Sequence, residues 1–103
     1  MKIRGLDSSE ILDLQGIIPL WSVNDLTSLS REFKFNSFRI GLEFVNIIGD
    51  ISETLNHHPD IMLSWSAVTI SITTHSIKSL SELDVELARR IDNSYLKFSE
   101  LKG

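Results

Sequence analysis

The sequence predicts an α+β fold of two layers, in which helices cover one face of a mostly antiparallel sheet. Apolar residues recur every three or four positions in some segments, as in helices, and alternate with polar residues in others, as in strands. The resulting order is helix, strand, strand, helix, one or two strands, helix, which favours helices layered on a sheet. With 103 residues, the chain has the usual size of one domain.

The first three elements are expected to be a helix and a two-stranded hairpin. Residues 7–15 (DSSEILDLQ) predict a short helix, which Ser8 or Ser9 would cap. Two short strands are expected over 17–23 and 28–35, and the NDLT sequence between them favours a hairpin turn. One side of the second strand would carry Leu29, Arg31, Phe33 and Phe35.

The segment 37–55 is the strongest helix prediction in the chain. Its start would be capped by Asn36 or Ser37. Apolar residues at intervals of three or four would form one stripe facing the core. This stripe consists of Phe38, Leu42, Val45, Ile48, Ile51 and Leu55.

The sequence LNHHPD (55–60) predicts where that helix stops. Proline disfavours helical geometry at the residue before it, so His58 is expected to be extended. Asn56 tolerates the left-handed conformation that is common at helix C-termini. A helix that ends here would direct His57 and His58 into one space from different directions.

The last strands and the last helix follow. Residues 64–75 predict a strand, or two strands within one run, because apolar and hydroxyl-bearing residues alternate there. Ser79 with Glu82 offers one capping box for the last helix. Ser81 with Asp84 offers another, and the following apolar residues continue at helical spacing.

Composition argues against several classes of protein. No apolar run approaches the roughly 20 residues that cross a bilayer, so no membrane partner is expected. The net charge is −4 and the ten Lys and Arg residues are scattered, which argues against nucleic acid as a partner. The absence of cysteine removes disulfides and thiolate chemistry. No secretory signal is visible in the first residues, and a cytoplasmic location is expected.

The three histidines are the candidate chemical groups. Glu53 and His57 are four residues apart on the predicted helix, so the carboxylate could orient the imidazole. His75 closes a predicted strand, where a rigid scaffold often presents functional groups. Each residue also has a structural interpretation: a helix-terminal histidine suits the negative end of the helix dipole, and Glu53 could be a solvated helix residue.

Trp65 and Asp84 have ordinary structural interpretations as well. Trp65 would more often be a core residue, and Asp84 fits the N3 position of a helix cap. In an unbroken strand, Trp65 and His75 would face away from the apolar positions of that strand. If the apolar positions pack under the helices, a bend or a neighbouring subunit must bring His75 to the helix end.

A metal site is the chemical alternative. Glu53, one of the paired histidines and His75 could supply the two-histidine, one-carboxylate set that some metals use. No H-x-x-H or H-x-x-x-H spacing supports this alternative, and almost every ligand would have to come from a separate element. The sequence therefore favours no bound metal.

Several motifs are more specific together than any single residue. Glu53-x-x-x-His57-His58-Pro59 is followed by Trp65, His75 and Asp84. The segments LSREFKFNSF (29–38), VTISITTHS (68–76) and LSELDVELARRID (80–92) add three longer patterns. Together they resemble the pterin-4a-carbinolamine dehydratases, whose patterns are R-x-F-x-F-x-x-F, V-x-I-x-L-x-T-H and L-T-x-x-D-x-x-L-A-x-x-I-D. The resemblance covers nearly everything after about residue 20.

The resemblance implies a fold and an activity. The family fold has three helices on one face of a four-stranded antiparallel sheet, and its members usually form homodimers or homotetramers. They dehydrate the 4a-hydroxytetrahydropterin that aromatic amino acid hydroxylases release, and the product is quinonoid dihydropterin. They use no metal and no cofactor.

The resemblance also implies roles for individual residues. His57 and His75 would be the acid–base pair, since imidazole exchanges protons near neutral pH. His58 would hold the pterin and assist, and Glu53 would orient the histidines. The other candidates for binding the pterin are Pro59, Trp65, Thr74, Ser76 and Asp84.

Two features depart from the family pattern. Between the Thr-His pair and the last helix, the family usually has an acidic residue and then glycines, whereas this chain has Ser76-Ile77-Lys78-Ser79. Without glycine, positive φ is less accessible, so this loop is expected to differ in shape. Asn56 also replaces an aspartate of animal members. The loop favours an alternative in which the chain is a catalytically weak or inactive relative that acts as a protein-binding or assembly factor.

Overall fold

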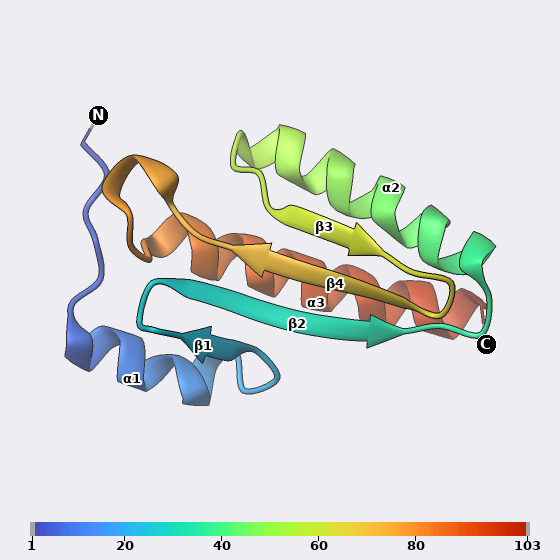
Figure 1. Ribbon diagram of the computed structural model, residues 1–103, viewed down its shortest axis with the longest axis horizontal. Coiled ribbons are helices and arrows are strands. Elements are labelled where there is room, and N and C mark those ends of the chain that lie inside the picture. Colours follow the sequence, from blue (N-terminus) through green and yellow to red (C-terminus); the bar gives the residue numbers. More distant parts are fainter. Residues whose placement is uncertain (1, 103) are drawn as a thin grey trace.

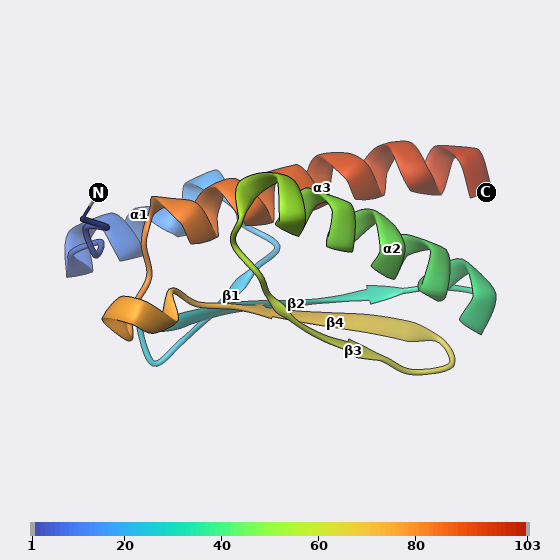
Figure 2. The same ribbon diagram turned by 90° about the horizontal axis from the view of Figure 1, so that it is seen from above.

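Residues 2–102 are described by a computed structural model and form two layers (Figures 1 and 2). The helices lie on one face of the sheet and are α1 (Ser8–Ile17), α2 (Phe38–Leu55) and α3 (Glu82–Lys102). The strands are β1 (Ser22–Asn24), β2 (Ser28–Lys34), β3 (Asp60–Leu63) and β4 (Ala67–Ile72). They form one antiparallel sheet in the order β1-β2-β4-β3. The predicted α+β two-layer fold is confirmed.

Helix α1 begins at Ser8, inside the predicted range 7–15, and its cap is Asp7. The Asp7 side chain accepts a hydrogen bond of 2.9 Å from the backbone N–H of Glu10, whose carboxylate accepts one of 3.0 Å from the backbone N–H of Asp7. This is a complete capping box, and it places Ser8 and Ser9 inside the helix. Either serine was expected to be the cap, and both expectations were wrong because Asp7 pairs with Glu10.

The predicted hairpin is present, but its first strand is short. Strand β1 covers only Ser22–Asn24, because α1 continues to Ile17 and a turn containing Pro19 follows. Strands β1 and β2 pair through a tight turn in which Asp25 and Leu26 have φ values of 51° and 61°. Positive φ at both central residues is typical of the mirrored turns that suit twisted hairpins.

Helix α2 has nearly the predicted bounds, and the Ser37 hydroxyl caps it by accepting the Ile40 N–H at 3.2 Å. Its buried face is rotated from the predicted stripe: Phe38 and Leu42 are 49% and 41% exposed. The buried residues are Gly41, Phe44, Ile48 and Ser52. A Cβ atom on Gly41 would lie only 3.1 Å from the Leu63 side chain, so this glycine allows α2 to lie close to the sheet.

The run 64–75 contains only one strand. Strand β3 lies before it, at Asp60–Leu63, and was not predicted. Strand β4 ends at Ile72, after which the chain bends through a 3₁₀ turn at His75–Ile77. The Thr74 N–H bonds the Ser79 carbonyl at 3.0 Å and closes this bend. Of the two alternatives left open near His75, a bend or a neighbouring subunit, the bend is present within this chain.

Helix α3 starts at the second of the two predicted capping boxes. The Ser81 hydroxyl accepts the Leu83 N–H at 3.2 Å, and Asp84 accepts the Ser81 N–H at 2.8 Å. Aromatic rings from β2, the residue after Lys34, α2 and α3 pack together between the layers. The cluster consists of Phe33, Phe35, Phe44, Tyr95 and Phe98. None of the described helices combines the length and apolar character needed to cross a membrane.

Candidate active site

Three segments meet at one end of the sheet: the C-terminal end of α2, the loop after β4 and the start of α3 (Figure 1). A pocket of about 330 Å³ lies there, which is within the range of small-molecule sites. Its lining residues are Ile3, Asn56, His57, His58, Thr73, Thr74, His75, Ser76 and Leu83. All three histidines of the sequence therefore line one pocket.

The end of α2 determines where the paired histidines lie. Asn56 has φ 53° and ψ 43°, in the left-handed region, as predicted. Its N–H bonds the Glu53 carbonyl at 3.3 Å, and the His57 N–H bonds the Ser52 carbonyl at 3.1 Å. These two bonds form a Schellman motif, which ends the helix and turns the chain away from the helix axis. His57 and His58 consequently leave the helix and enter the pocket together.

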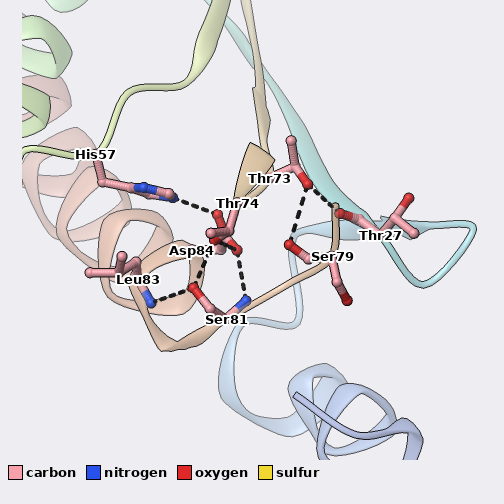
Figure 3. Close-up of polar contacts among 8 residues, drawn as sticks. All are labelled: Thr27, His57, Thr73, Thr74, Ser79, Ser81, Leu83 and Asp84. Carbon is pink, nitrogen blue, oxygen red and sulfur yellow. Dashed lines mark hydrogen bonds and ion pairs between the residues drawn. The ribbon is translucent and has the colours of Figure 1, made fainter. Parts of the chain in front are cut away.

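His57 is held by a buried carboxylate from α3 (Figure 3). Its Nε2 lies 2.7 Å from Oδ1 of Asp84, and the two side chains are 11% and 0% exposed. An ionised carboxylate only accepts hydrogen bonds, so Nε2 carries the proton of this contact. The other nitrogen, Nδ1, has no partner among residues 2–102, where no buried polar side-chain atom is left unpaired. It is therefore accessible for proton exchange.

Asp84 is the most connected residue of the site. Its Oδ2 accepts hydrogen bonds from the Thr74 hydroxyl at 2.7 Å and from the Ser81 N–H at 2.8 Å. The residue also lies in the first turn of α3, where the positive end of the helix dipole favours negative charge. Asp84 is among the residues expected to bind the pterin. Its carboxylate is fully buried, and its contact with a residue of the pocket's histidine set is the hydrogen bond to His57.

Glu53 contacts His58, not His57. Its Oε2 is hydrogen-bonded to Nε2 of His58, and both side chains are exposed. The expected pairing with His57 was wrong because the left-handed turn at Asn56 removes His57 from the helical face that Glu53 occupies. A contact between exposed groups holds His58 only weakly compared with the buried contact of His57.

His75 begins the 3₁₀ turn after β4 and is exposed to the pocket. Its ring has no hydrogen-bond partner among the described residues, so both ring nitrogens are free to contact a ligand. The turn ends at Lys78, whose φ of 51° lies in the left-handed region. The loop without glycines therefore still uses a positive φ, but at a lysine.

The remaining predicted residues are in different places. Ser76 and Thr74 line the pocket, although the Thr74 hydroxyl is directed to Asp84. Pro59 is half-buried and follows His58 without lining the pocket. Trp65 is 73% exposed in the β3–β4 turn, at the far end of the sheet (Figure 1). Strand β4 separates it from His75 by about 20 Å at 3.3 Å per residue. Within one chain, Trp65 is not part of the pocket.

The sequence did not point to every lining residue. Ile3 and Leu83 supply apolar surface, and Thr73 precedes the predicted Thr74. Ile3 reaches the site because the N-terminal segment runs past the start of α3, where the Leu6 N–H bonds the Leu80 carbonyl at 2.8 Å. No local pattern in the sequence signals that contact.

The described residues do not form the metal site that was weighed as an alternative. Within residues 2–102, no group of three or more histidine, cysteine, aspartate or glutamate side chains is arranged to hold a metal ion. Glu53 is engaged with His58, and Nε2 of His57 is engaged with Asp84. Nδ1 of His57 and the ring nitrogens of His75 have no partner among the described residues, and both residues line the pocket.

Comparisons with known proteins show which family this chain is similar to. The sequence pattern of the family described as "Pterin 4 alpha carbinolamine dehydratase" matches residues 4–94. A relative from Rubrobacter xylanophilus, named "Putative pterin-4-alpha-carbinolamine dehydratase", is 40% identical over 87 residues, which cover 84% of this chain and 81% of the relative. A relative of the same name from Alkaliphilus metalliredigens is 44% identical over 72 residues, which cover 70% of this chain and 65% of the relative.

A solved structure extends the comparison to the fold. The crystal structure of a "transcriptional coactivator/pterin dehydratase" from Brucella melitensis superposes with a TM-score of 0.81 and 27% sequence identity. The match covers 87% of this chain and 97% of that one. The family pattern, the relatives and the shared fold lead to one conclusion: the chain belongs to the pterin-4-alpha-carbinolamine dehydratase family.

Proposed function

We propose that this protein is a lyase that dehydrates 4a-hydroxytetrahydropterin to quinonoid dihydropterin and water. One observation carries the proposal: the three histidines of the chain line a single pocket, with His57 fixed by a buried carboxylate. Family membership supports the same activity, since the curated relatives are named for it. The first substrate to test is the tetrahydrobiopterin derivative.

The reaction needs two proton transfers, and the site offers a group for each. The C4a–O bond breaks as the hydroxyl takes up a proton and leaves as water. The N5–H bond gives up its proton, and its electrons form the N5=C4a double bond. Neutral His57 keeps its proton on Nε2 beside Asp84, so Nδ1 suits the removal of the N5 proton. His75 supplies the proton to the hydroxyl, and His58 holds the ring.

Dehydration kinetics test this proposal. The 4a-carbinolamine would be generated in situ, and quinonoid dihydropterin would be followed by its absorbance. We expect a rate above the spontaneous one, proportional to protein concentration and lost in His75→Ala. A rate equal to the spontaneous one, with folded protein at high concentration, would exclude the activity on this substrate.

We also propose that the protein is a homodimer or homotetramer. Strand β3 is an edge strand, and unpaired edges favour association. Exposed apolar side chains lie on α2 and around β3, namely Phe38, Leu42, Met62 and Trp65. Light scattering after size-exclusion chromatography should give a multiple of the 11.7 kDa chain mass, reduced to the monomer mass by Met62→Lys. The cytoplasmic location is part of the proposal and rests on family membership alone.

The alternative is a binding or assembly factor with weak or no dehydratase activity. The Brucella protein is described as a coactivator as well as a dehydratase, and a pterin dehydratase-like RuBisCO assembly factor superposes on this fold with a TM-score of 0.58 at 22% identity. In this chain, the observation that favours the alternative is Lys78, whose left-handed backbone occupies the loop where the family uses glycine. Loss of dehydration but not of partner binding in a His57→Ala, His75→Ala double variant would separate the two activities.

A further inference from the structure

A chain of buried hydrogen bonds lies behind His57. Its hydroxyl groups bond to one another and to Asp84. Thr74 Oγ1 lies 2.7 Å from Oδ2 of Asp84 and 2.7 Å from Oγ of Ser81. Ser81 Oγ also accepts the Leu83 N–H at 3.2 Å (Figure 3). The Thr74 and Ser81 residues are 2% and 1% exposed. The chain therefore connects the first turn of α3 to the carboxylate that holds His57.

The direction of each bond follows from the number of hydrogens. A hydroxyl group has one hydrogen to donate. Ionised Asp84 only accepts, so the Thr74 hydrogen is donated to it. The Ser81 hydroxyl must then donate to Thr74, while its oxygen accepts the Leu83 N–H. All the bonds point toward Asp84, and in a buried site such chains polarise and strengthen each other.

We propose that Thr74 is a positioning residue that fixes the tautomer and orientation of His57 through Asp84. Its hydroxyl and the Ser81 N–H hold Oδ2, which leaves Oδ1 directed at Nε2 of His57. With Oδ1 fixed, the proton stays on Nε2, and Nδ1 remains the proton acceptor in the pocket. The sequence placed Thr74 among the groups that contact the pterin. Its single hydrogen is already committed to Asp84, which makes positioning the better role.

The inference rests on the proposed dehydratase function, but part of its test does not need activity. The variant Thr74→Val keeps the branched shape and removes the hydroxyl, whereas Thr74→Ser keeps the hydroxyl. Thr69→Val is the matched control, because Thr69 lies on β4 outside the pocket. The measurements are the ¹⁵N chemical shifts of the His57 ring, and kcat and KM for dehydration. The ring shifts report the tautomer directly.

In the wild type and in Thr69→Val, we expect the His57 ring to show one tautomer, protonated at Nε2. Thr74→Val should mix the tautomers and lower kcat about tenfold with KM changed less than about twofold, because proton transfer and not binding is affected. Thr74→Ser should show the same His57 ring shifts and the same kcat as the wild type. Wild-type ring shifts and kcat in Thr74→Val would overturn the inference, and so would a Thr74→Ser variant as impaired as Thr74→Val.

The inference can still be tested if Thr74→Val does not fold or if the wild type has no dehydratase activity. If Thr74→Val does not fold, Thr74→Ala replaces it, since that change also removes the hydroxyl that donates to Asp84. Unchanged His57 ring shifts in Thr74→Ala would then overturn the inference, and mixed tautomers would support it. If the wild type does not dehydrate pterins, the proposed function fails, and the ring shifts of the Thr74 variants alone decide whether Thr74 positions His57.

Discussion

The two paired histidines differ in how firmly each is held. His57 is 11% exposed beside a carboxylate that is fully buried, whereas His58 and Glu53 are 54% and 77% exposed. Ion pairs in solvent contribute little, while a buried hydrogen-bonded charge is costly to leave unpaired. His57 is therefore the rigid group of the site, and His58 has the freedom to adjust to a ligand.

Replacing Asp84 should uncouple His57 from its support. Asp84→Asn keeps the size of the side chain but replaces one carboxylate oxygen with an NH₂ group. That group donates a hydrogen bond, so beside His57 it would favour the tautomer that lacks the proton on Nε2. We expect kcat for dehydration to fall about a hundredfold or more, and the free energy of unfolding to fall by about 1–3 kcal/mol. Steady-state kinetics and urea unfolding would check both values.

The matched control for that change is Glu53→Gln. It alters the exposed contact with His58 in the same chemical way. Its effect on unfolding should be below about 1 kcal/mol. Equal losses of kcat in Glu53→Gln and Asp84→Asn would contradict the distinction between a rigid His57 and an adjustable His58.

Sequence reasoning found the three histidines but not the partner of His57. Spacing on a helix favoured Glu53, because residues four apart share a face. That rule fails once Asn56 turns the chain into the left-handed region. The capping pattern Ser81–Asp84 correctly placed the Asp84 carboxylate at the start of α3. The proximity of α2 and α3 that completes the pair arises only from tertiary packing.

The loop between β4 and α3 contains a lysine in the left-handed backbone conformation. Lys78 has φ 51° and ψ 41° at the end of the 3₁₀ turn that contains His75. For residues with a side chain, the left-handed region costs roughly 1–2 kcal/mol, and glycine avoids this cost. Lys78 therefore adopts a conformation that glycine would adopt at a lower cost.

Lys78→Gly should stabilise the protein. The relief of strain outweighs the greater flexibility of glycine in the unfolded chain, and we expect the free energy of unfolding to rise by about 0.5–1 kcal/mol. Lys97→Gly in helix α3 is the control and should lower stability by about 1 kcal/mol. Urea denaturation measures both changes. A Lys78→Gly variant less stable than the wild type would show that the lysine side chain, not the backbone, supports this loop.

The start of helix α1 carries charged groups whose contribution to stability depends on pH. The Arg4 guanidinium donates two hydrogen bonds of 2.9 Å to Glu10, and with the Asp7 N–H it lowers the pKa of Glu10 from 4.5 to about 2. A lowered pKa in the folded state stabilises the protein above the unfolded value. That stabilisation disappears as pH falls from about 4.5 to about 2.

Thermal unfolding across this pH range tests the role of Glu10. At pH 6, Glu10→Gln should have a lower melting temperature than the wild type, because the charge that Arg4 and Asp7 stabilise is missing. Near pH 2, where Glu10 of the folded protein is about half protonated, most of the difference should be lost. A difference that stays constant from pH 6 to pH 2 would mean that Glu10 acts through its shape and not its charge.

Helices and strands could be predicted from the sequence where the local pattern is long. For helix α2, the sequence predicted the cap, the length and the left-handed residue at the C-terminal end. Strand β3 was missed because four residues between a proline and a turn show too little alternation. The rotation of α2 toward Gly41 was also missed, since hydropathy alone does not reveal a close approach of helix and sheet.

At the level of the whole molecule, one carboxylate connects the β1–β2 hairpin region to helix α3. Asp92 on α3 accepts hydrogen bonds from the Trp21 indole N–H at 2.8 Å and from Arg31 at 2.6 Å. The Arg31 guanidinium also lies 4.2 Å above the centre of the Phe33 ring. The side chains of Arg31 and Asp92 are 15% and 24% exposed, so the pair is largely shielded from solvent. It attaches the β1–β2 hairpin to α3.

Asp92→Ala should destabilise the whole molecule. It leaves the indole N–H and the guanidinium without their acceptor, and we expect a loss of about 2 kcal/mol in the free energy of unfolding. Glu86→Ala, which breaks the exposed pair with Arg90, should cost less than about 0.5 kcal/mol. Urea unfolding followed by tryptophan fluorescence measures both. Similar costs for the two variants would show that shielding from solvent does not strengthen the Asp92 contacts.

The proposed function assigns different tasks to the three histidines. Steady-state dehydration kinetics of the variants His57→Ala, His58→Ala and His75→Ala test this assignment. We expect kcat to fall about 10²- to 10⁴-fold in His57→Ala and in His75→Ala, since each removes a proton-transfer group. In His58→Ala, the main change should be a higher KM, because this residue holds the pterin. Wild-type kcat in His57→Ala or His75→Ala would contradict acid–base catalysis by this pocket.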